Sequence, residues 1–370
     1  MRNRHATCSR CADACTSGCI SVVDGQLVID KDKCIGCGTC ATVCPTCAIE
    51  SENPTDAELF SQTLHAMKAA NGTAVIACER MLERAKGVYD TEKVSEVVCL
   101  GRVDESLIAL MALAGGKRVV LVGGGCDQCP HRVGLDTAEL VCSTVNELLA
   151  TWNNPLRARV SQKLPGIVRK RADEAYDKGK RAVFMQVTNK ATSATADAVE
   201  EKLSSPLGKT PEQKQKEEKK EFKVNEAGVL PQHIPTRRKR LLKTLSEMGE
   251  PKDEVVATRL WGEVHIDKSV CKSCQMCATF CPTGALTRFK DKDGTVGIEH
   301  YAGCCVKCRC CTDICPNNAI TLSDEVRAVD LMHGFVEKYP MDEPEIHRGG
   351  VHQMRDVMQK LAVKSQVLDH

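Results

Sequence analysis

Aromatic side chains are scarce in this chain, since Phe, Tyr and Trp together make up 3% of its 370 residues. This composition excludes a core packed around large rings, so smaller side chains have to fill it. Long hydrophobic runs are missing as well. The most apolar stretch, residues 107–122, is interrupted at residues 115–118, and a bilayer span needs about 18 uninterrupted apolar residues, so we expect no transmembrane helix. Residues 1–20 lack the apolar segment of a secretory signal peptide.

An excess of charge of either sign is also absent. The 51 Lys and Arg residues nearly balance the 49 Asp and Glu residues, which gives a formal net charge of +2 at pH 7. This balance argues against a nucleic-acid or anionic-lipid partner. Cysteine, in contrast, occurs 24 times. Such a number is typical of disulfide-rich secreted domains, but without a signal peptide we expect free thiols in a reducing cytoplasm.

Three stretches arrange their cysteines as C-x2-C-x2-C-x3-C-P. They run over Cys34–Pro45, Cys271–Pro282 and Cys305–Pro316. This is the ligand pattern of bacterial ferredoxins for a cubane [4Fe–4S] cluster, in which the fourth cysteine binds the neighbouring cluster. Three thiolates two residues apart let one short loop cover three corners of the cube. Zinc sites instead separate two C-x2-C pairs by a spacer, so the unbroken spacing favours iron and sulfide.

A self-comparison shows an internal repeat, because residues 27–34 match residues 264–271. The C-terminal half thus has two cluster-binding runs in tandem, and the N-terminal run needs a partner. The segment Cys8–Cys19 is the candidate, although it has one extra residue before its third cysteine and Ile20 where proline is expected. We interpret it as the missing half of the module, since the fourth cysteine of the regular run would otherwise have no neighbouring cluster to bind.

If the fourth cysteine of each run binds the cluster of the other run, which we call the interleaved rule, the four runs bind four [4Fe–4S] clusters. Their ligand sets are Cys8, Cys11, Cys15 and Cys44; Cys34, Cys37, Cys40 and Cys19; Cys271, Cys274, Cys277 and Cys315; and Cys305, Cys308, Cys311 and Cys281. Of the cysteines outside these sets, Cys47 and Cys142 are expected to be buried small residues. Cys304 and Cys310 flank predicted ligands, so ligand exchange at these two positions stays open.

The middle of the chain has a different pattern, in which valine-rich runs alternate with helical segments. We expect strands at residues 73–77, 94–98, 118–122 and 182–187, and helices at residues 56–70, 79–86, 104–114, 137–152 and 192–203. This alternation predicts a parallel α/β sheet. Three strands end in cysteines, and ligands bind at the carboxyl edge of such sheets. Four sulfurs there would hold a [2Fe–2S] cluster, with the ligands Cys78, Cys99, Cys126 and Cys129. The alternative is that they are ordinary buried cysteines.

The segments Val98–Asp104 and Gly116–His131 resemble the delta subunit of methyl-viologen-reducing hydrogenase, through the motif C-x-G-R-V-D, a valine-rich strand and a Gly-Cys…Cys-His ending. The resemblance spans about residues 75–131. It implies a [2Fe–2S] domain that passes electrons between a hydrogenase and a heterodisulfide-reductase-like partner. This chain departs from the family by having Glu79 and Arg80 where a second cysteine usually follows, and by a shorter gap between Cys126 and Cys129.

These patterns predict an α+β multidomain protein. It comprises a ferredoxin-like 2[4Fe–4S] module at residues 1–52, the central α/β parallel-sheet domain at 55–203, a polar flexible linker at 204–234, a helix with a second ferredoxin-like module at 235–325, and a helical tail at 326–370. Helices are expected at residues 235–249, 326–338 and 353–364. We expect the basic start of the first to be a solvated face, with a docking patch for an acidic redox partner as the alternative. His333, His347 and His352 lack the spacing of a metal site.

Cubanes bound by four cysteines have no open iron position, so the sequence favours an electron-transfer subunit over an enzyme. We expect an electron-transfer chain with paired [4Fe–4S] clusters at its two ends and the [2Fe–2S] cluster in the middle. The resemblance implies a hetero-oligomeric complex of an anaerobic metabolism, with hydrogenase- or formate-dehydrogenase-like and heterodisulfide-reductase-like or flavin-containing partners. One alternative is an oxidoreductase that uses Cys126 and Cys129 as a redox dithiol or binds a flavin there, although residues 123–129 lack the G-x-G-x-x-G pattern. The third possible function is that of a structural scaffold that binds zinc.

Overall fold

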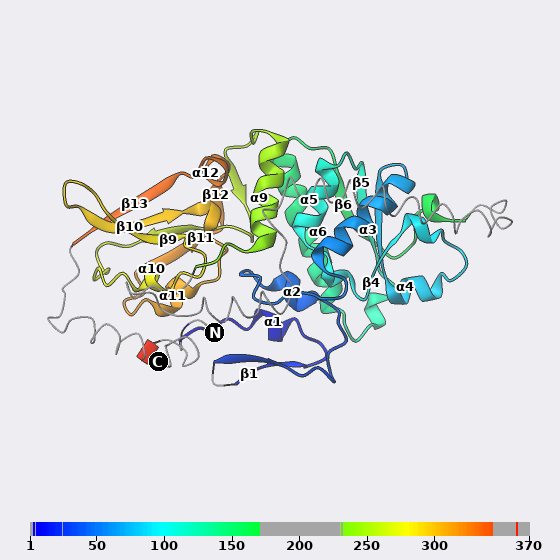
Figure 1. Ribbon diagram of the computed structural model, residues 1–370, viewed down its shortest axis with the longest axis horizontal. Helices are drawn as coiled ribbons and strands as arrows, with labels where there is room; N and C mark the ends of the chain where they lie inside the picture. Colours follow the sequence, from blue (N-terminus) through cyan, green and yellow to red (C-terminus); the bar gives the residue numbers. More distant parts are fainter. Residues whose placement is uncertain are drawn as a thin grey trace.

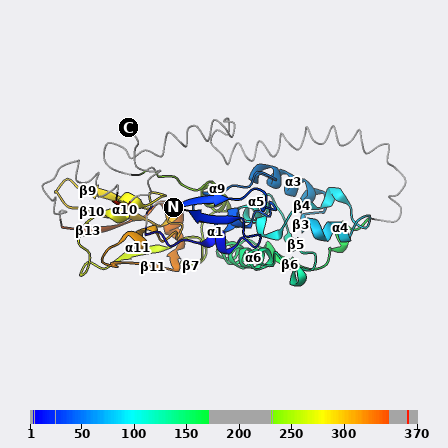
Figure 2. The ribbon, with the colours of Figure 1, turned by 90° about the horizontal axis from the view of Figure 1, so that it is seen from below.

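The computed structural model describes residues 3, 5–23, 25–170, 230, 232–342 and 360–361. These residues form three units, which are a central parallel sheet with its helices and one small mixed module from each end of the chain (Figure 1). The N-terminal module lies below the junction of the C-terminal module and the central domain in the view of Figure 1 and contacts both (Figures 1 and 2). The sequence predicted the three units, but it predicted the central domain as the middle one.

The central sheet has four parallel strands in the order β4-β3-β5-β6. They are β3 (Thr73–Cys78), β4 (Ser95–Val97), β5 (Arg118–Val122) and β6 (Arg157–Ser161). The first three confirm the predicted strands, because short valine-rich runs buried on both faces are typical of parallel sheets. The strand β6 was not predicted, since its alternating arginines resemble a surface segment. The predicted strand at 182–187 and the helix at 192–203 lie outside the described residues.

Helices cover both faces of this sheet. One face packs against α3 (Asp56–Ala69), α5 (Glu105–Leu113) and α6 (Val133–Thr151), and the other against α4 (Glu79–Arg84) and the segment around Val168. Alternate residues of the strands serve the two cores, with Ile76 and Leu121 in the larger one and Val75 and Val120 in the smaller. The larger core is almost entirely aliphatic, as the scarcity of aromatic residues in the sequence requires.

The two terminal modules are built from short helices and hairpins. The N-terminal module has α1 (Arg10–Asp13), α2 (Thr39–Val43) and the hairpin of β1 (Ile20–Val23) and β2 (Gln26–Ile29). In the C-terminal module, α10 (Met276–Phe280) packs beside α11 (Cys310–Ile314), and β8 (Glu263–Ile266) pairs with β11 (Ile320–Ser323). A three-stranded antiparallel sheet of β9 (Leu286–Lys290), β10 (Val296–Tyr301) and β13 (Val336–Met341) completes it.

The structure corrects the predicted helix at residues 326–338. The chain first forms β12 (Glu325–Arg327), which pairs with β7 (Val255–Ala257), and then the short helix α12 (Ala328–His333). Gly334 ends this helix in the left-handed conformation, with a φ of +64°. The following residues form β13, which pairs with β10 along its whole length. Of the second predicted helix, at 353–364, the structure describes only residues 360 and 361.

The helix α9 (Thr236–Met248) joins all three units, and its basic start is not a wholly solvated face. Arg237 is buried, with 9% of its surface exposed. Its guanidinium donates to the Asp56 carboxylate of α3 at 3.0 Å and to the Ala41 carbonyl oxygen of α2 at 2.7 Å. The prediction failed because a run of Arg and Lys looks the same in a sequence whether solvent or buried carboxylates face it.

Asp56 is the centre of this ionic contact. Besides Arg237, its carboxylate accepts a hydrogen bond of 2.6 Å from Arg102 and lies 3.5 Å from the Arg240 guanidinium. Burial alone would raise the pKa of Asp56, but the attraction of the arginines outweighs it and holds the pKa well below its usual range. The carboxylate therefore stays ionised and ties α9 to the central domain.

An apolar core reinforces this contact. Leu241 and Leu245 of α9 pack with Ala109 of α5 and with both tryptophans of the chain, Trp152 and Trp261. The two largest aromatic side chains thus lie between units rather than inside one. In the described part of the chain, no helix is both long and apolar enough to cross a bilayer.

The substitution Asp56→Asn tests this contact. It removes the carboxylate that three arginines share in a largely buried place and leaves Arg102 and Arg237 only the Asp104 carboxylate, at 4.0 and 3.6 Å, so we expect the free energy of unfolding to fall by about 3 kcal/mol. Urea denaturation followed by circular dichroism measures the change. The matched control is Asp136→Asn, which removes an exposed carboxylate that lies 3.9 Å from Arg132 and should change the free energy by less than about 0.5 kcal/mol. Equal losses in the two variants would contradict the role of Asp56.

The stabilisation lost in Asp56→Asn is predicted to depend on pH. Because the folded-state pKa of Asp56 is depressed, its stabilisation is complete above the ordinary aspartate pKa of about 3.9 and is lost as the pH falls through the folded value. The difference in unfolding free energy between the parent protein and Asp56→Asn should therefore be constant from neutral pH down to roughly pH 5. It should shrink only in more acidic solution. A difference that disappears between neutral pH and pH 5 would show that another group titrates.

Candidate metal centres

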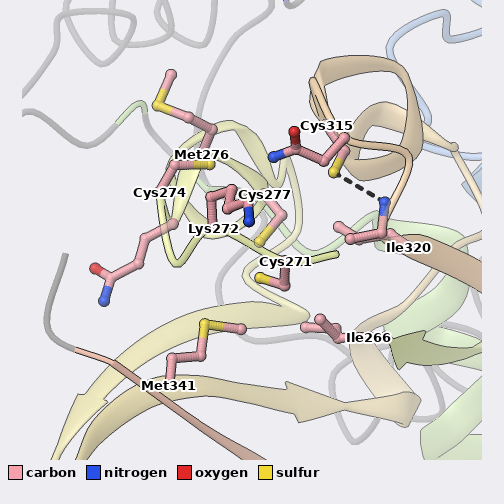
Figure 3. Close-up of a pocket in the computed structure, with 12 residues that line it drawn as sticks. Ile266, Cys271, Lys272, Cys274, Met276, Cys277, Cys315, Ile320 and Met341 are labelled. Atoms are coloured by element: carbon pink, nitrogen blue, oxygen red, sulfur yellow. Dashed lines mark hydrogen bonds between the residues drawn. The ribbon is translucent and has the colours of Figure 1, made fainter. Parts of the chain in front are cut away.

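The C-terminal module contains a cavity lined by four thiols that come from both of its cysteine runs. They are Cys271, Cys274, Cys277 and Cys315, the set predicted for one cluster. Figure 3 shows Cys271, Cys277 and Cys315 turned toward the same space, between the loop that precedes α10 and the end of α11. The Cys315 sulfur accepts a hydrogen bond of 3.3 Å from the Ala319 backbone N–H. Apolar side chains, including Ile266 and Met341, form the wall opposite.

A second cavity has the complementary set. It is lined by Cys281, Cys305, Cys308 and Cys311. The fourth cysteine of each run therefore lies with the first three of the other run, because the neighbouring helices α10 and α11 each end at that cysteine. In the described residues, neither cavity has Cys304 or Cys310 in its lining. Cys310 donates instead to the Phe280 carbonyl oxygen at 3.3 Å, which favours ligand sets without exchange.

The loops of the three regular runs share an unusual backbone conformation. The residues on both sides of the middle cysteine have positive φ, at Gly36 and Gly38, at Ser273 and Gln275, and at Lys307 and Arg309. For a residue with a side chain this conformation costs roughly 1–2 kcal/mol. Alternation of left- and right-handed residues turns successive N–H groups toward one point and forms a nest that binds anions, as at many iron–sulfur sites. Four thiolates with inorganic sulfide make such a negatively charged group.

The donor set in the two C-terminal cavities fits a multi-iron group. Burial raises the pKa of Cys277 to about 12 and that of Cys305 to about 11, with neighbouring cysteines adding to the effect. Such thiols become ligands only when a cation compensates the charge of the thiolate, and iron supplies that charge. Within the described ranges, no three His, Cys, Asp or Glu side chains have the close spacing required by a single metal ion. A cube with a metal at each of four corners needs its ligands further apart.

The N-terminal module has one regular cysteine run, Cys34–Pro45, and one irregular run, Cys8–Cys19. The regular run matches the C-terminal arrangement more closely than the irregular run does. Cys34 and Cys37 are electrostatic neighbours of Cys40 and, after the larger effect of burial, contribute to raising its pKa to about 11. Cys34 is also a neighbour of Cys19, as the predicted set requires.

The irregular run folds differently, because Cys11 lies inside the helix α1 rather than in a left-handed loop. Burial raises the pKa of Cys11, and its neighbours Cys44 and Cys8 raise it further, so three thiols of the predicted set lie together. The fourth, Cys15, has its sulfur 3.3 Å from that of Cys19. The structure therefore places Cys15 beside the second N-terminal set, and its assignment to the first stays a prediction.

The central cysteines meet at the carboxyl edge of the parallel sheet. Cys78 is the last residue of β3, Cys99 follows β4, and Cys126 and Cys129 follow β5. The strands β4 and β5 flank β3, so their loops open at the point where the strand order reverses, which is where ligands bind in such sheets. The Cys78 sulfur accepts a hydrogen bond of 3.2 Å from the Gly124 backbone N–H. Burial has the largest effect in raising the pKa of the Cys126 thiol, and the neighbouring thiols of Cys78 and Cys129 raise it further.

Glycines make the space for these thiols. A Cβ atom at Gly134 would lie 2.2 Å from the Cys99 sulfur, and one at Gly123 would lie 2.6 Å from the Cys126 sulfur. Both distances are far below van der Waals contact. The four converging sulfurs and the amide donor fit the requirements of a [2Fe–2S] cluster. No sequence pattern singled out Gly134, because its neighbour Cys99 is distant along the chain.

Four cysteines lie outside all five sets, and besides Cys304 and Cys310 they are Cys47 and Cys142. Cys142 is buried on α6, and burial together with Glu105 and Glu139 raises its pKa to about 12. It is the small buried residue that the sequence predicted. Cys47 is only partly buried and has a φ of +50° at the position where the repeat has Gly284. Its nearest charged neighbours include Arg237, so this residue lies at the junction with α9 rather than in a core.

Comparison with known proteins supports the ferredoxin motifs. The 4Fe-4S binding domain family matches residues 27–50 and 264–287, which contain one regular run each. A 7Fe ferredoxin of Hydrogenibacillus schlegelii is 44% identical over 43 residues, which are 12% of this chain and 55% of the ferredoxin. A subunit of an ion-translocating oxidoreductase complex of Methanosarcina acetivorans is 42% identical over 43 residues, 12% of this chain and 16% of that protein. An uncharacterized ferredoxin of Methanocaldococcus jannaschii is 38% identical over 50 residues, 14% of this chain and 30% of that protein.

The chain thus spans between 16% and 55% of the length of these relatives. No solved structure matches it significantly. The matched segments show [4Fe–4S]-binding motifs at both ends of the chain and support an iron–sulfur electron-transfer role.

The substitution Gly134→Ala tests the central site. Alanine favours a helix by about 1 kcal/mol over glycine, so α6 itself should tolerate the change. The added methyl group, however, would displace the Cys99 sulfur, and we expect a weakened or lost [2Fe–2S] signal in electron paramagnetic resonance (EPR) spectra of the reduced protein. Gly166→Ala is the control, because a Cβ atom there has no neighbour within 4 Å. An unchanged signal in Gly134→Ala would argue against Cys99 as a ligand.

Proposed function

We propose that this chain is a non-catalytic electron-transfer subunit that carries four [4Fe–4S] clusters and one [2Fe–2S] cluster. Within a hetero-oligomeric complex it relays electrons between a hydrogenase- or formate-dehydrogenase-like module and a heterodisulfide-reductase-like or flavin-containing oxidoreductase. The observation that carries the proposal is the pair of C-terminal cavities, each lined by four cysteines in the interleaved combination of a two-cluster ferredoxin.

Each part of these cavities has a role in binding the clusters. When bound, the clusters supply one-electron redox chemistry. The four cysteines of each cavity would occupy every iron corner, so no coordination position is left for a substrate. Left-handed residues such as Gln275 and Arg309 turn backbone N–H groups inward and stabilise negative charge. Apolar walls such as Ile266 and Leu286 keep water away, and burial of this kind tunes a reduction potential.

The proposed partners rest on two resemblances. The central cysteine loops resemble the delta subunit of methyl-viologen-reducing hydrogenase, which passes electrons to a heterodisulfide-reductase-like protein. One relative of the ferredoxin segments is a subunit of an ion-translocating oxidoreductase complex, which supports assembly with other proteins. The identity of subunits that co-purify with the chain under anaerobic conditions tests this part of the proposal. A chain that purifies alone, fully loaded with iron, would argue against a stable complex.

Iron analysis of two cysteine variants tests the cluster sites. Cys277→Ala removes one of four ligands in the first C-terminal cavity, so we expect a loss of about four iron atoms per chain from the anaerobically prepared protein. Cys142→Ala makes the same change at a buried cysteine on α6 and should keep the full iron and sulfide content. Full iron in Cys277→Ala, or protein without acid-labile sulfide, would overturn the proposed sites.

A further inference from the structure

We propose that the five iron–sulfur sites lie on one unbranched path whose order differs from their order in the sequence. The path runs from the C-terminal pair through the N-terminal pair to the central cysteines, so that the N-terminal module is the bridge and the central site is a terminus. This inference rests on the proposed function and adds the route, the two junctions and the faces where partners bind.

The first junction joins the C-terminal and N-terminal modules through residues that flank predicted ligands. The Asn3 side-chain amide donates to the Cys310 sulfur at 3.3 Å, in a buried contact between residues 307 positions apart. The Thr7 backbone N–H, next to Cys8, donates to the Asp313 carboxylate at 3.0 Å. Arg10 donates to the Lys307 carbonyl oxygen at 3.4 Å. The second C-terminal set therefore lies beside the first N-terminal set.

The second junction joins the N-terminal module to the central domain. The Thr42 hydroxyl of α2 donates to the Arg102 carbonyl oxygen at 3.1 Å, and the Thr16 hydroxyl lies 2.6 Å from His131 Nδ1, two residues after Cys129. The backbones approach closely, because a Cβ atom at Gly101 would lie 2.3 Å from the Thr39 hydroxyl oxygen. The loop that carries Cys37 and Cys40 is thus in contact with the loop that carries Cys99.

The C-terminal module and the central domain also touch, but away from the central cysteines. Their shared core takes Ala109 and Trp152 from the central domain, neither of which flanks a predicted ligand, and packs them against α9, Trp261 and Ala302. In the described residues, both C-terminal cavities are lined only by side chains between positions 264 and 341. The route through the N-terminal module is therefore the one in which ligand-bearing loops meet at each step.

This order places the two ends of the path in different units. The first C-terminal cavity, with the exposed Cys274 on its rim, lies in the C-terminal module, and the sheet edge with Cys126 and Cys129 lies in the central domain, on the other side of α9 (Figure 1). Each transfer moves one electron without making or breaking a bond. One partner protein donates electrons at one end and another accepts them at the other, so we expect the two partners to bind opposite ends.

Spin relaxation in the full-length, anaerobically prepared protein tests the order of the sites. A reduced [4Fe–4S] cluster next to the central [2Fe–2S] cluster speeds its relaxation, and the effect falls steeply with distance. In dithionite-reduced protein, Cys40→Ala, which disrupts the second N-terminal set, should abolish this enhancement and lower the microwave power that half-saturates the [2Fe–2S] signal. Cys277→Ala, which disrupts the first C-terminal set, should leave the half-saturating power unchanged.

The opposite pattern, with Cys277→Ala having the larger effect, would overturn the proposed order. Iron and sulfide analysis of each variant shows separately whether its cluster is lost. Protein that contains no clusters therefore refutes the proposed function, whereas clusters with the wrong coupling refute only the path. Iron-replete protein without a [2Fe–2S] signal would also refute the last step of the path.

A variant of the second junction supplies an independent test. Gly101→Ala removes no predicted ligand, but its methyl group would overlap the Thr39 hydroxyl and lie 2.9 Å from the Gly134 Cα atom, so it forces α2 and the start of α6 away from residues 99–102. We expect full iron content and a partial loss of the relaxation enhancement. Gly166→Ala is again the control and should keep both. Unchanged relaxation in Gly101→Ala would contradict contact between these two sites.

Discussion

One partly buried carboxylate fixes the relative positions of the three units. Asp56 accepts a hydrogen bond from Arg102 of its own domain and is paired with Arg237 and Arg240 of the helix that leads into the C-terminal module. Arg237 also donates to the Ala41 carbonyl oxygen, so the N-terminal module is attached to the same point. Charges removed from water are costly to separate, because each partner left behind stays buried without compensation. The ion pairs therefore hold the cysteine loops of neighbouring units against each other.

The cluster sites obey a different physical requirement, which is local. In the regular runs a short loop has left-handed residues on both sides of its middle cysteine, and its three thiols lie within seven residues. Glycine fills these positions in the N-terminal run, whereas Gln275 and Arg309 fill equivalent ones in the C-terminal runs. Backbone strain at non-glycine positions persists only where the surroundings compensate it, and a bound anionic cluster is such a compensation.

The arrangement of the units shows where the protein uses its few aromatic residues. The central core consists of aliphatic side chains from both faces of a parallel sheet, and the C-terminal module contains cysteines in its core. The two tryptophans lie where α9 packs on the central domain. The two largest rings are therefore used to join units, and the interior of the C-terminal module includes its thiols.

The sequence by itself determined the features that depend on neighbouring residues. These include the cysteine runs, the interleaved grouping seen in the C-terminal cavities, and the strands β3, β4 and β5, because each follows from spacing or periodicity within a short segment. Only the tertiary structure decided that Arg237 is buried, that residues 336–341 form a strand, and that the N-terminal module contacts both of the other units. Those features depend on contacts such as Asn3 with Cys310, between residues 307 positions apart, and no local pattern encodes such a contact.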